Sequence, residues 1–228
     1  DEFINRYFRY CLWLGDCPPD EIRKMPECIK RIEAVRAFRE KSQRGTTRKL
    51  AETPRRFGTE NMPESTFVVI PKVSSEKRRY IPIGFMTPDT LVSDLVFIVP
   101  NATLYHLGIL TSNVHMAWTR AVCGRLEMRY RYSKDIVYNN FPWPDATDEQ
   151  KSAIEKLAQG VLDARALFPE SSLADLYDPL TMPPELLKAH KDLDRAVMKL
   201  YNFPVKDFTE AECVAALMER YKKLSNEK

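Results

Sequence analysis

Glycine is scarce in this sequence and widely spread. Its seven residues, at positions 15, 45, 58, 84, 108, 124 and 160, never lie close enough together to form a phosphate-binding loop or a dinucleotide fingerprint. Long apolar runs are also missing, because none approaches the roughly 20 residues of a membrane span, and the polar start DEFINRYFRY is unlike a signal peptide. We therefore expect a soluble, cytoplasmic protein without a nucleotide-binding fold.

The sequence also lacks clustered metal ligands. Its five cysteines, at positions 11, 17, 28, 123 and 213, form no Cys-x-x-Cys pair, and its three histidines, at 106, 115 and 190, are far apart. We therefore expect no zinc site, no disulfide framework and no cofactor in this chain. The sequence starts at Asp1 rather than at an initiator Met, and we expect it to be part of a longer protein.

What is present is enough apolar material for a core and an uneven charge distribution. The chain has 228 residues, 44% of them hydrophobic and 11% aromatic, which suits one large domain or two modest ones. Residues 1–134 contain 23 Lys and Arg against 15 Asp and Glu, whereas residues 135–228 contain 12 against 17. This asymmetry predicts that the two parts of the chain have different partners.

The basic excess is greatest in residues 23–56, with 12 basic against 4 acidic residues. In its later part, cations alternate with small polar residues that hydrogen-bond well to phosphates. We therefore predict DNA-backbone contacts from this segment. The residues are Arg44, Thr46, Thr47, Arg48, Lys49, Arg55 and Arg56. A solvated helix surface is the alternative for the earlier part, residues 23–41.

Periodicity in the first 143 residues predicts a mixture of strands and helices. Strands are expected at 8–14, at 66–70 and 80–85 as a hairpin with a basic tip, at 95–99, at 104–110 and through 127–138. Helices are expected from Glu27 to about Lys41 and at 111–123, and residues 42–64 are expected to form a long loop. Pro71 and Pro82 indicate strands that lie at a sheet edge or carry bulges.

After Pro144 the pattern becomes helical. Apolar residues recur at helical spacing in 148–168, 184–201 and 209–224, and Thr209 with Glu212 forms a capping-box candidate. The sequence therefore predicts an α+β fold with two parts. Residues 1–143 would form a mixed sheet-and-helix domain and residues 144–228 an all-α helical subdomain.

Catalytic motifs are not found in the sequence. One type of nuclease uses a Pro-Asp pair followed, roughly one strand further along, by Glu-x-Lys. Here Glu149-Gln150-Lys151 follows Pro144-Asp145 too closely for that motif and begins a helix, so we interpret it as a chance match. His115 has no carboxylate or nucleophile beside it in the sequence and is interpreted as a surface or partly buried histidine. No catalytic residue is predicted in this chain.

Alternate charged residues in 127–131 suit the reading of DNA bases. Glu127, Arg129 and Arg131 would project from one face of the expected strand, with Met128, Tyr130 and Tyr132 on the other. Arginine matches the O6 and N7 edge of guanine, and glutamate accepts from the amino group of cytosine. The alternative, equally compatible with the pattern, is a ladder of salt bridges on a solvated sheet.

Several motifs, considered together, resemble the target recognition domain and C-terminal helical region of MmeI-like enzymes, which are large bacterial adenine-N6 DNA methyltransferases sometimes fused to a nuclease. The motifs cover nearly the whole chain. They are RYCLWL at 9–14, IPKVSSEKRRYIP at 70–82, ILTS at 109–112 before a helix with Trp118, RYS at 131–133, NFPWP at 140–144, MPPEL at 182–186, LDRAV at 193–197, Leu200-Tyr201 and Arg220-Tyr221 with Leu224.

The resemblance implies sequence-specific recognition of double-stranded DNA in a restriction-modification protein. The family's catalytic half binds S-adenosylmethionine and flips the target adenine into an Asn-Pro-Pro-aromatic pocket; here Asn140 is followed by Phe141-Pro142, so the cofactor and the catalysis are expected in the longer parent. The catalytic methyltransferase domain of the same polypeptide is therefore an expected partner of this chain.

The resemblance places base contacts at 127, 129 and 131, with Lys72 close to another part of the base-reading surface. Further DNA-backbone contacts are predicted at Ser74, Ser75, Arg78, Arg79, Arg125 and Lys134. A function of another class stays open: the chain could be a protein-interaction module whose basic face meets an acidic partner. Competition by duplex DNA would separate the two functions.

Overall fold

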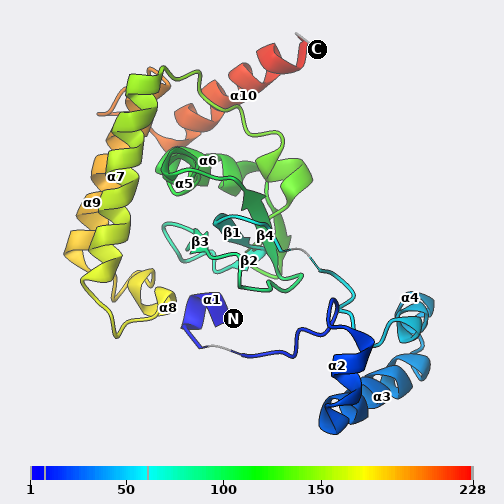
Figure 1. The fold of residues 1–228 in the computed structure, drawn as a ribbon. Coiled ribbons are helices and arrows are strands. Elements are labelled where there is room, and N and C mark those ends of the chain that lie inside the picture. The colour runs from blue at the N-terminus through cyan, green and yellow to red at the C-terminus, as the bar shows by residue number, and fades with distance from the viewer. Residues whose placement is uncertain (1, 8, 61, 227–228) are drawn as a thin grey trace. The chain divides into compact units, whose positions relative to one another are not determined.

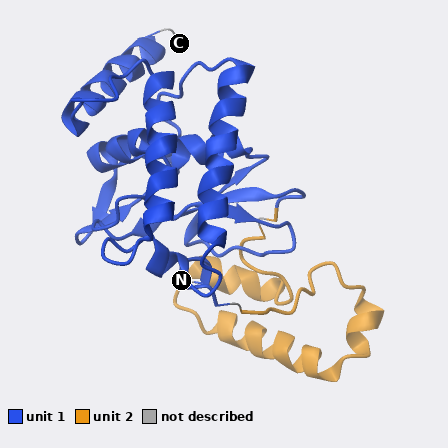
Figure 2. Ribbon diagram, turned by 90° about the vertical axis from the view of Figure 1, so that its left-hand side faces the viewer, with its two compact units in different colours: residues 1–7, 63–228 blue, residues 8–62 orange. Residues whose placement is uncertain are grey.

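The computed structural model describes residues 2–7, 9–60 and 62–226, and it forms two compact units (Figure 2). Unit 1 consists of residues 1–7 and 63–228, and unit 2 of residues 8–62. The chain has an α+β fold, as predicted, with small antiparallel sheets in its earlier part and long helices in its later part.

Unit 2 is built from short helices with few buried side chains. It contains α2 (Pro19–Arg23), α3 (Pro26–Glu40), α4 (Gly45–Lys49) and the 3-10 helix η1 (Leu50–Glu52). The helix predicted from Glu27 is confirmed as α3, and proline stands at its first position because that position needs no N–H donor. None of the apolar residues of α3 is buried, and Phe38 is 76% exposed.

Two sequence predictions for unit 2 are wrong. The described residues of the expected first strand, 9–14, have no regular secondary structure, because no neighbouring strand supplies backbone hydrogen bonds to them. The expected long loop at 42–64 contains α4 and η1, which are held by arginine side chains rather than by an apolar stripe.

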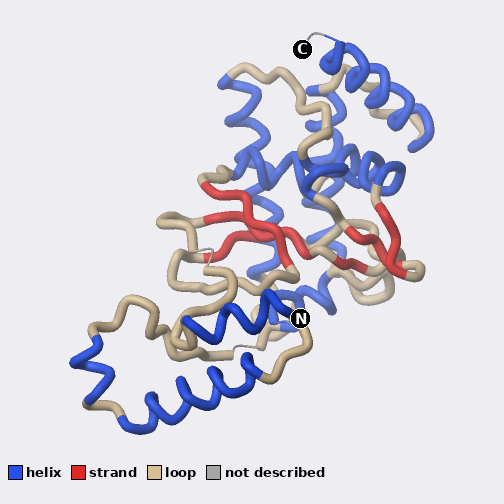
Figure 3. The backbone as a smooth tube through the Cα atoms, turned by 90° about the vertical axis from the view of Figure 1, so that its right-hand side faces the viewer, coloured by secondary structure: helices blue, strands red, loops and turns tan. Residues whose placement is uncertain are grey.

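Unit 1 contains two three-stranded antiparallel sheets, whose strands lie together in Figure 3. The first has the order β3-β1-β4, with β1 (Phe67–Pro71) buried along its whole length between β3 (Gly84–Met86) and β4 (Val96–Pro100). The second has the order β2-β6-β5, with β6 (Arg129–Arg131) between β2 (Val73–Ser74) and β5 (Gly124–Leu126).

The strands near the prolines differ from the prediction. β1 and β3 do pair antiparallel, but the segment between them contributes β2 to the second sheet, so no simple hairpin is formed. β1 is the central strand of its sheet rather than an edge strand, and Pro71 is tolerated because the pairing with β3 ends at Val69, so no neighbouring strand needs an N–H from position 71. Pro82 lies outside the strands.

Two expected strands contain helices instead. Residues 104–110 form α5 (Leu104–Leu110), because the Thr103 side chain accepts a hydrogen bond from the backbone N–H of Tyr105 and the helix is buried on nearly every side. A short apolar run of that kind suits a buried strand and a buried helix equally well. Residues 127–138 are not one strand, since Lys134–Tyr138 form the π-helix η2, capped by Ser133.

The remaining helices of unit 1 pack side by side. α7 (Asp148–Ala166) packs against both α5 and α9 (Pro184–Leu200), and α10 (Glu210–Asn226) packs against α6 (Asn113–Val122), as seen in Figure 1. The short helices α1 (Glu2–Asn5) and α8 (Leu173–Leu176) were not predicted. The predictions of α6 and of the three long later helices are confirmed, including the reciprocal capping of Thr209 and Glu212.

One hydrophobic core joins the sheets to these later helices. It extends from Val68 in β1 through Trp118 in α6 to Leu217 in α10, all of them at most 2% exposed. The indole N–H of Trp118 donates to the carbonyl oxygen of Val137, which ties α6 to η2. The small sheets of unit 1 are therefore supported by helices from both halves of the sequence.

A close approach between α5 and α7 gives a prediction about packing. A Cβ atom on Gly108 would lie 2.7 Å from Cγ2 of Ile154, whereas a Cβ atom on Gly160, also in a helix, would have open space around it. We expect Gly108→Ala to lower the free energy of unfolding by about 1–3 kcal/mol through overpacking. Gly160→Ala, the matched control, should raise it by about 0.5–1 kcal/mol. Denaturant unfolding measures both, and equal effects would contradict this packing.

A buried histidine gives a prediction about pH. His115 is completely buried in α6, with its Nε2 2.9 Å from the Tyr132 hydroxyl, rather than partly exposed as predicted, and burial lowers its pKa to about 3. Below about pH 6.5 the unfolded chain therefore takes up a proton that the folded chain does not. We expect this histidine alone to lower the free energy of unfolding by about 2 kcal/mol between pH 7 and pH 5.

A matched variant isolates that effect. Asp194 acts in the opposite direction, because burial raises its pKa to about 6 and the folded chain gains a proton first as the pH falls. We therefore compare the wild-type chain with His115→Gln, whose amide can still reach Tyr132, by urea unfolding at pH 7 and pH 5. The loss of stability on acidification should be about 2 kcal/mol smaller in the variant. Identical losses would show that His115 does not titrate in this way.

Candidate nucleic-acid interface

The hairpin formed by β5 and β6 carries the predicted base-reading residues. Its register pairs Leu126 with Arg129, which leaves Glu127 and Met128 as a two-residue turn. Glu127 has a φ of 57°, as the first central residue of such a turn requires in the type that matches the strand twist. The prediction that Glu127 lies within the strand is therefore wrong, because no glycine or asparagine marks this turn in the sequence.

The alternation expected along 129–132 is present. Arg129 and Arg131 are exposed, whereas Tyr130 and Tyr132 are 4% and 3% exposed, so the two guanidinium groups share the outer face of β6. Met128 was expected on the tyrosine face, but at the turn it is 71% exposed. The hairpin thus presents two arginines outward and anchors itself by two buried tyrosines.

Glu127 remains close to the arginines despite its place in the turn. Its carboxylate is 2.8 Å from Nη2 of Arg129, and the two side chains are 76% and 47% exposed. An ion pair this open to water contributes at most about 1 kcal/mol to stability. The pair therefore places the Glu127 carboxylate, a hydrogen-bond acceptor, beside the donors of Arg129 on an accessible surface, and it contributes little to the stability of the fold.

Lys72 is brought beside β6 through its backbone. The carbonyl oxygen of Lys72 accepts from the backbone N–H of Tyr132 at 2.8 Å, next to the pairing of Val73 with Arg131. Its ammonium group lies 4.7 Å from the centroid of the Phe97 ring. Lys72 thus lies opposite Tyr132, on the tyrosine side of the sheet, and its charge is placed over the Phe97 ring, which also contacts Tyr132.

The predicted backbone-contact residues near the hairpin have different surroundings. Arg125 and Lys134 are exposed, and the Arg125 guanidinium lies 4.2 Å from the Tyr130 ring centroid. Ser75 is half-buried, and its hydroxyl accepts from the backbone N–H of Lys77. Ser74, in β2 opposite Tyr130, is 3% exposed, so a phosphate would reach its hydroxyl only if β2 moved.

Arg78 and Arg79 end the loop that follows β2. Arg78 is half-buried, and burial lowers its pKa while the charge of Asp178 opposes that shift. Arg79 is exposed, and its Nε donates to the Tyr80 hydroxyl at 3.2 Å. Arg78 therefore lies near a carboxylate that is distant in the sequence, whereas Arg79 is bonded to its neighbour in the sequence.

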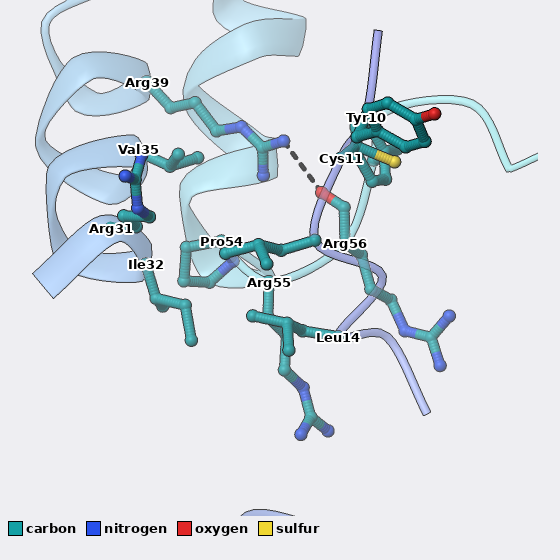
Figure 4. Close-up of a pocket in the computed structure, with 12 residues that line it drawn as sticks. Tyr10, Cys11, Leu14, Arg31, Ile32, Val35, Arg39, Pro54, Arg55 and Arg56 are labelled. Carbon is teal, nitrogen blue, oxygen red and sulfur yellow. Dashed lines mark hydrogen bonds between the residues drawn. The ribbon is translucent and has the colours of Figure 1, made fainter. Parts of the chain in front are cut away.

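In unit 2, several arginines bind the unit's own backbone. Arg39 donates to the carbonyl oxygens of Leu50, Thr53 and Arg56, and Arg48 donates to those of Ser42 and Gln43. Figure 4 shows Arg39 reaching Arg56 beside an open cavity of about 530 Å³ lined by apolar and arginine side chains. Hydrogen bonds from guanidinium groups thus replace much of the apolar core that unit 2 lacks.

Among the predicted phosphate-contact residues of unit 2, Arg55 and Arg56 also have internal partners. Arg55 donates to the carbonyl oxygen of Cys17, and Arg56 pairs with Glu60 at 2.6 Å and Asp16 at 2.9 Å. The hydrogen bond to Glu60, followed by that to Asp16, raises the pKa of Arg56. Arg44, Thr46 and Lys49 are exposed, Thr47 is half-buried, and no ion pair involves Arg44 or Lys49 in the part of the chain that the structure describes.

The described residues contain no group of three or more Cys, His, Asp and Glu side chains arranged to hold a metal ion. Over residues 2–7, 9–60 and 62–226, no helix is long and apolar enough to cross a membrane.

Comparisons with known proteins cover nearly the whole chain. Residues 1–145 match the family model described as the MmeI target recognition domain, and residues 146–227 match the one for the MmeI C-terminal domain. A relative named DNA methyltransferase A, from Bacillus subtilis (strain 168), is 40% identical over 225 residues, which are 98% of this chain and 25% of that protein.

A solved structure of the Type IIL restriction-modification enzyme MmeI in complex with DNA is also similar. It superposes with a TM-score of 0.94 at 45% sequence identity, and the match covers 99% of this chain and 30% of that one. The chain thus spans about a quarter of the length of the curated relative and under a third of the solved one.

Proposed function

The chain belongs to the MmeI family, as its target recognition and C-terminal domains, and from this premise we propose that it recognises a specific DNA sequence for a SAM-dependent adenine-N6 DNA methyltransferase of the restriction-modification type. The observation that carries the proposal is the row formed by Arg129 and Arg131 on the outer face of an exposed hairpin, with Glu127 at its turn. The likeness to MmeI, solved with DNA, supports it.

The geometry of the hairpin suits the major groove. That groove admits a two-stranded β-ribbon, and its base edges offer acceptors on guanine and a donor on cytosine. Arg129 and Arg131 supply donors for guanine, and Glu127 supplies an acceptor for the cytosine amino group. Lys72, on the tyrosine side of the same sheet, would supply a donor separate from this row.

Contacts to phosphates would position the hairpin on the duplex but would not discriminate between base sequences. We assign them in unit 1 to Ser75, Arg78, Arg79, Arg125 and Lys134, and in unit 2 to Arg44, Thr46, Thr47 and Lys49. Ser74 would join them only if β2 moved. We give Arg48, Arg55 and Arg56 another role, that of bracing unit 2, because their guanidinium groups already bind carbonyl oxygens and two carboxylates.

The longer parent would supply the chemistry. We propose that its catalytic methyltransferase domain binds S-adenosylmethionine, receives the flipped adenine and is the partner of this chain within one polypeptide in the cytoplasm. Residues 1–143 would read the DNA, and the helical subdomain 144–228 would brace them. The family matches, which meet between residues 145 and 146, support that division.

The first test separates DNA recognition from the alternative of an acidic protein partner. The target site is first mapped from the adenines that the full-length protein methylates in a randomised duplex. The chain is then titrated with a labelled duplex containing that site and challenged with an unlabelled matched duplex, a scrambled duplex or polyglutamate. We expect the matched duplex to compete at least 1,000-fold better than the scrambled one, as is usual for specific readers. Equal competition by all three would leave only a general affinity for anions.

Substitution of the guanidinium row is the sharper prediction about specificity. Arg129→Ala or Arg131→Ala in the full-length protein should relax one position of the target site, because a good bidentate contact discriminates between bases by about 1–3 kcal/mol. Methylation of a randomised duplex, followed by mapping of the modified adenines, measures the change. Lys134→Gln is the control, since loss of a phosphate contact should weaken all sites alike. If both arginine variants methylate the same target sequence as the wild type, the row does not read bases and is only a ladder of charges exposed to solvent.

The two kinds of cation in unit 2 should respond differently to neutralisation. Arg44→Gln and Lys49→Gln should each weaken binding to all duplexes and make the slope of log affinity against log salt shallower by up to about 0.9, the value for one phosphate contact. Arg56→Gln should leave that slope unchanged and increase proteolysis of residues 8–62, because two carboxylates lose their partner. Unchanged slopes for Arg44 and Lys49 would confine the phosphate contacts to unit 1.

A further inference from the structure

The side chain of Arg79 is exposed and makes one hydrogen bond among the residues that the structure describes. Its Nε donates to the Tyr80 hydroxyl at 3.2 Å, and its guanidinium carbon lies 5.6 Å from the centroid of the Tyr80 ring. Nη1 and Nη2 make no hydrogen bond or ion pair within residues 2–7, 9–60 and 62–226. These two nitrogens are therefore available to an anion, while Nε is already committed.

Tyr80 links this arginine to a buried carboxylate. The Tyr80 ring is fully buried and stacks on His190 at a centroid distance of 4.1 Å. Its hydroxyl donates to Oδ2 of Asp194 at 2.6 Å, so the hydroxyl oxygen keeps its lone pairs for the Nε of Arg79. The direction of the hydrogen bonds, from Arg79 to Tyr80 to Asp194, is thus fixed by the donors available.

Asp194 is itself held in place. It lies on α9, is 5% exposed, and its Oδ1 accepts from the backbone N–H of Asn113 at 2.8 Å, at the start of α6. Burial raises its pKa to about 6, while Tyr80, Asn113 and the charges of Arg79 and Arg120 lower it, so the carboxylate is mainly charged at neutral pH. The hydrogen-bonded chain therefore ends on a fixed anion in the helical part.

A second contact fixes the backbone of Arg79. Nη2 of Arg120, on α6, donates to the Arg79 carbonyl oxygen at 2.9 Å, and Nη1 of Arg120 pairs with Glu210, at the start of α10, at 3.0 Å. The main chain and the side chain of Arg79 are thus tied to α6 and α9 by separate hydrogen bonds. An exposed arginine held at two points loses less freedom on binding than an unrestrained one.

We propose that Tyr80 and Asp194 are positioning residues that orient the Arg79 guanidinium so that Nη1 and Nη2 grip one DNA phosphate. This inference rests on the proposed function, since it explains how the arginine of one proposed contact to the DNA backbone is oriented before binding. Two parallel N–H donors match two phosphate oxygens, the geometry in which arginine binds phosphate best. The acidic helical part would thereby aid DNA binding through an arginine that it holds, without touching DNA itself.

A double-mutant cycle in the full-length protein tests the inference. Duplex affinity is measured by fluorescence anisotropy across a salt series for the wild type, Arg79→Ala, Tyr80→Phe and the double variant. Arg79→Ala should lower affinity and make the salt slope shallower by about 0.9. Tyr80→Phe should lower affinity about two- to tenfold, the cost of ordering one long side chain, with an unchanged slope because Arg79 keeps its charge. In the Arg79→Ala background, Tyr80→Phe should cost no further affinity.

Two further variants keep the result interpretable. Tyr201→Phe removes another largely buried hydroxyl, which donates to the Pro142 carbonyl oxygen and has no link to Arg79, and should leave affinity unchanged. Asp194→Asn replaces Tyr80→Phe in the cycle if the latter does not fold, and the same non-additivity is expected. Additive losses, or full affinity in folded Tyr80→Phe, overturn the inference. Absence of salt-dependent duplex binding by the wild type would overturn the proposed function instead.

Discussion

The exposed arginines of this protein depend on the burial of their neighbours. β6 is three residues long, and a strand of that length in a three-stranded sheet has little stability of its own. Tyr130 and Tyr132 anchor this segment in the core, and the Tyr132 hydroxyl lies 2.9 Å from Nε2 of His115. β5 pairs with one edge of β6 and β2 with the other. Fixed directions for Arg129 and Arg131 follow from these buried contacts, because successive residues of a strand face opposite sides.

Where chemistry is local, the sequence predicted this molecule well. α3 and the long later helices were predictable because their start signals and the regular spacing of their apolar residues lie within a few positions of each other. The alternation along 129–132 was also predictable, since it needs only a strand with one buried side. Residues 104–110 and the turn at Glu127 were mistaken because a short buried helix resembles a strand and because the turn lacks the usual glycine.

The rest of the candidate site depends on contacts between distant positions. Tyr80 and Asp194 are separated by 114 positions, and Arg120 reaches Arg79 across 41. No periodicity in a single sequence marks such pairs, so the charge of Arg79 was predictable but its partners were not. The same limit applies to unit 2. In the sequence every cation of its basic stretch looks available to a partner, whereas in the structure Arg39 binds backbone carbonyl oxygens and Arg56 pairs with Glu60.

The separation of outer face from inner face has a consequence for how specificity can change. Glu127 and Arg129 make one exposed ion pair with each other, which adds at most about 1 kcal/mol to stability, so their replacement changes the donors and acceptors of the outer face at little cost to the fold. Tyr130 and Tyr132 cannot change so freely, because each fills core volume, and truncation of a buried aromatic side chain costs about 3–5 kcal/mol. If the hairpin reads bases as proposed, new base preferences are therefore compatible with the same fold as long as its inward residues and their helical support are kept.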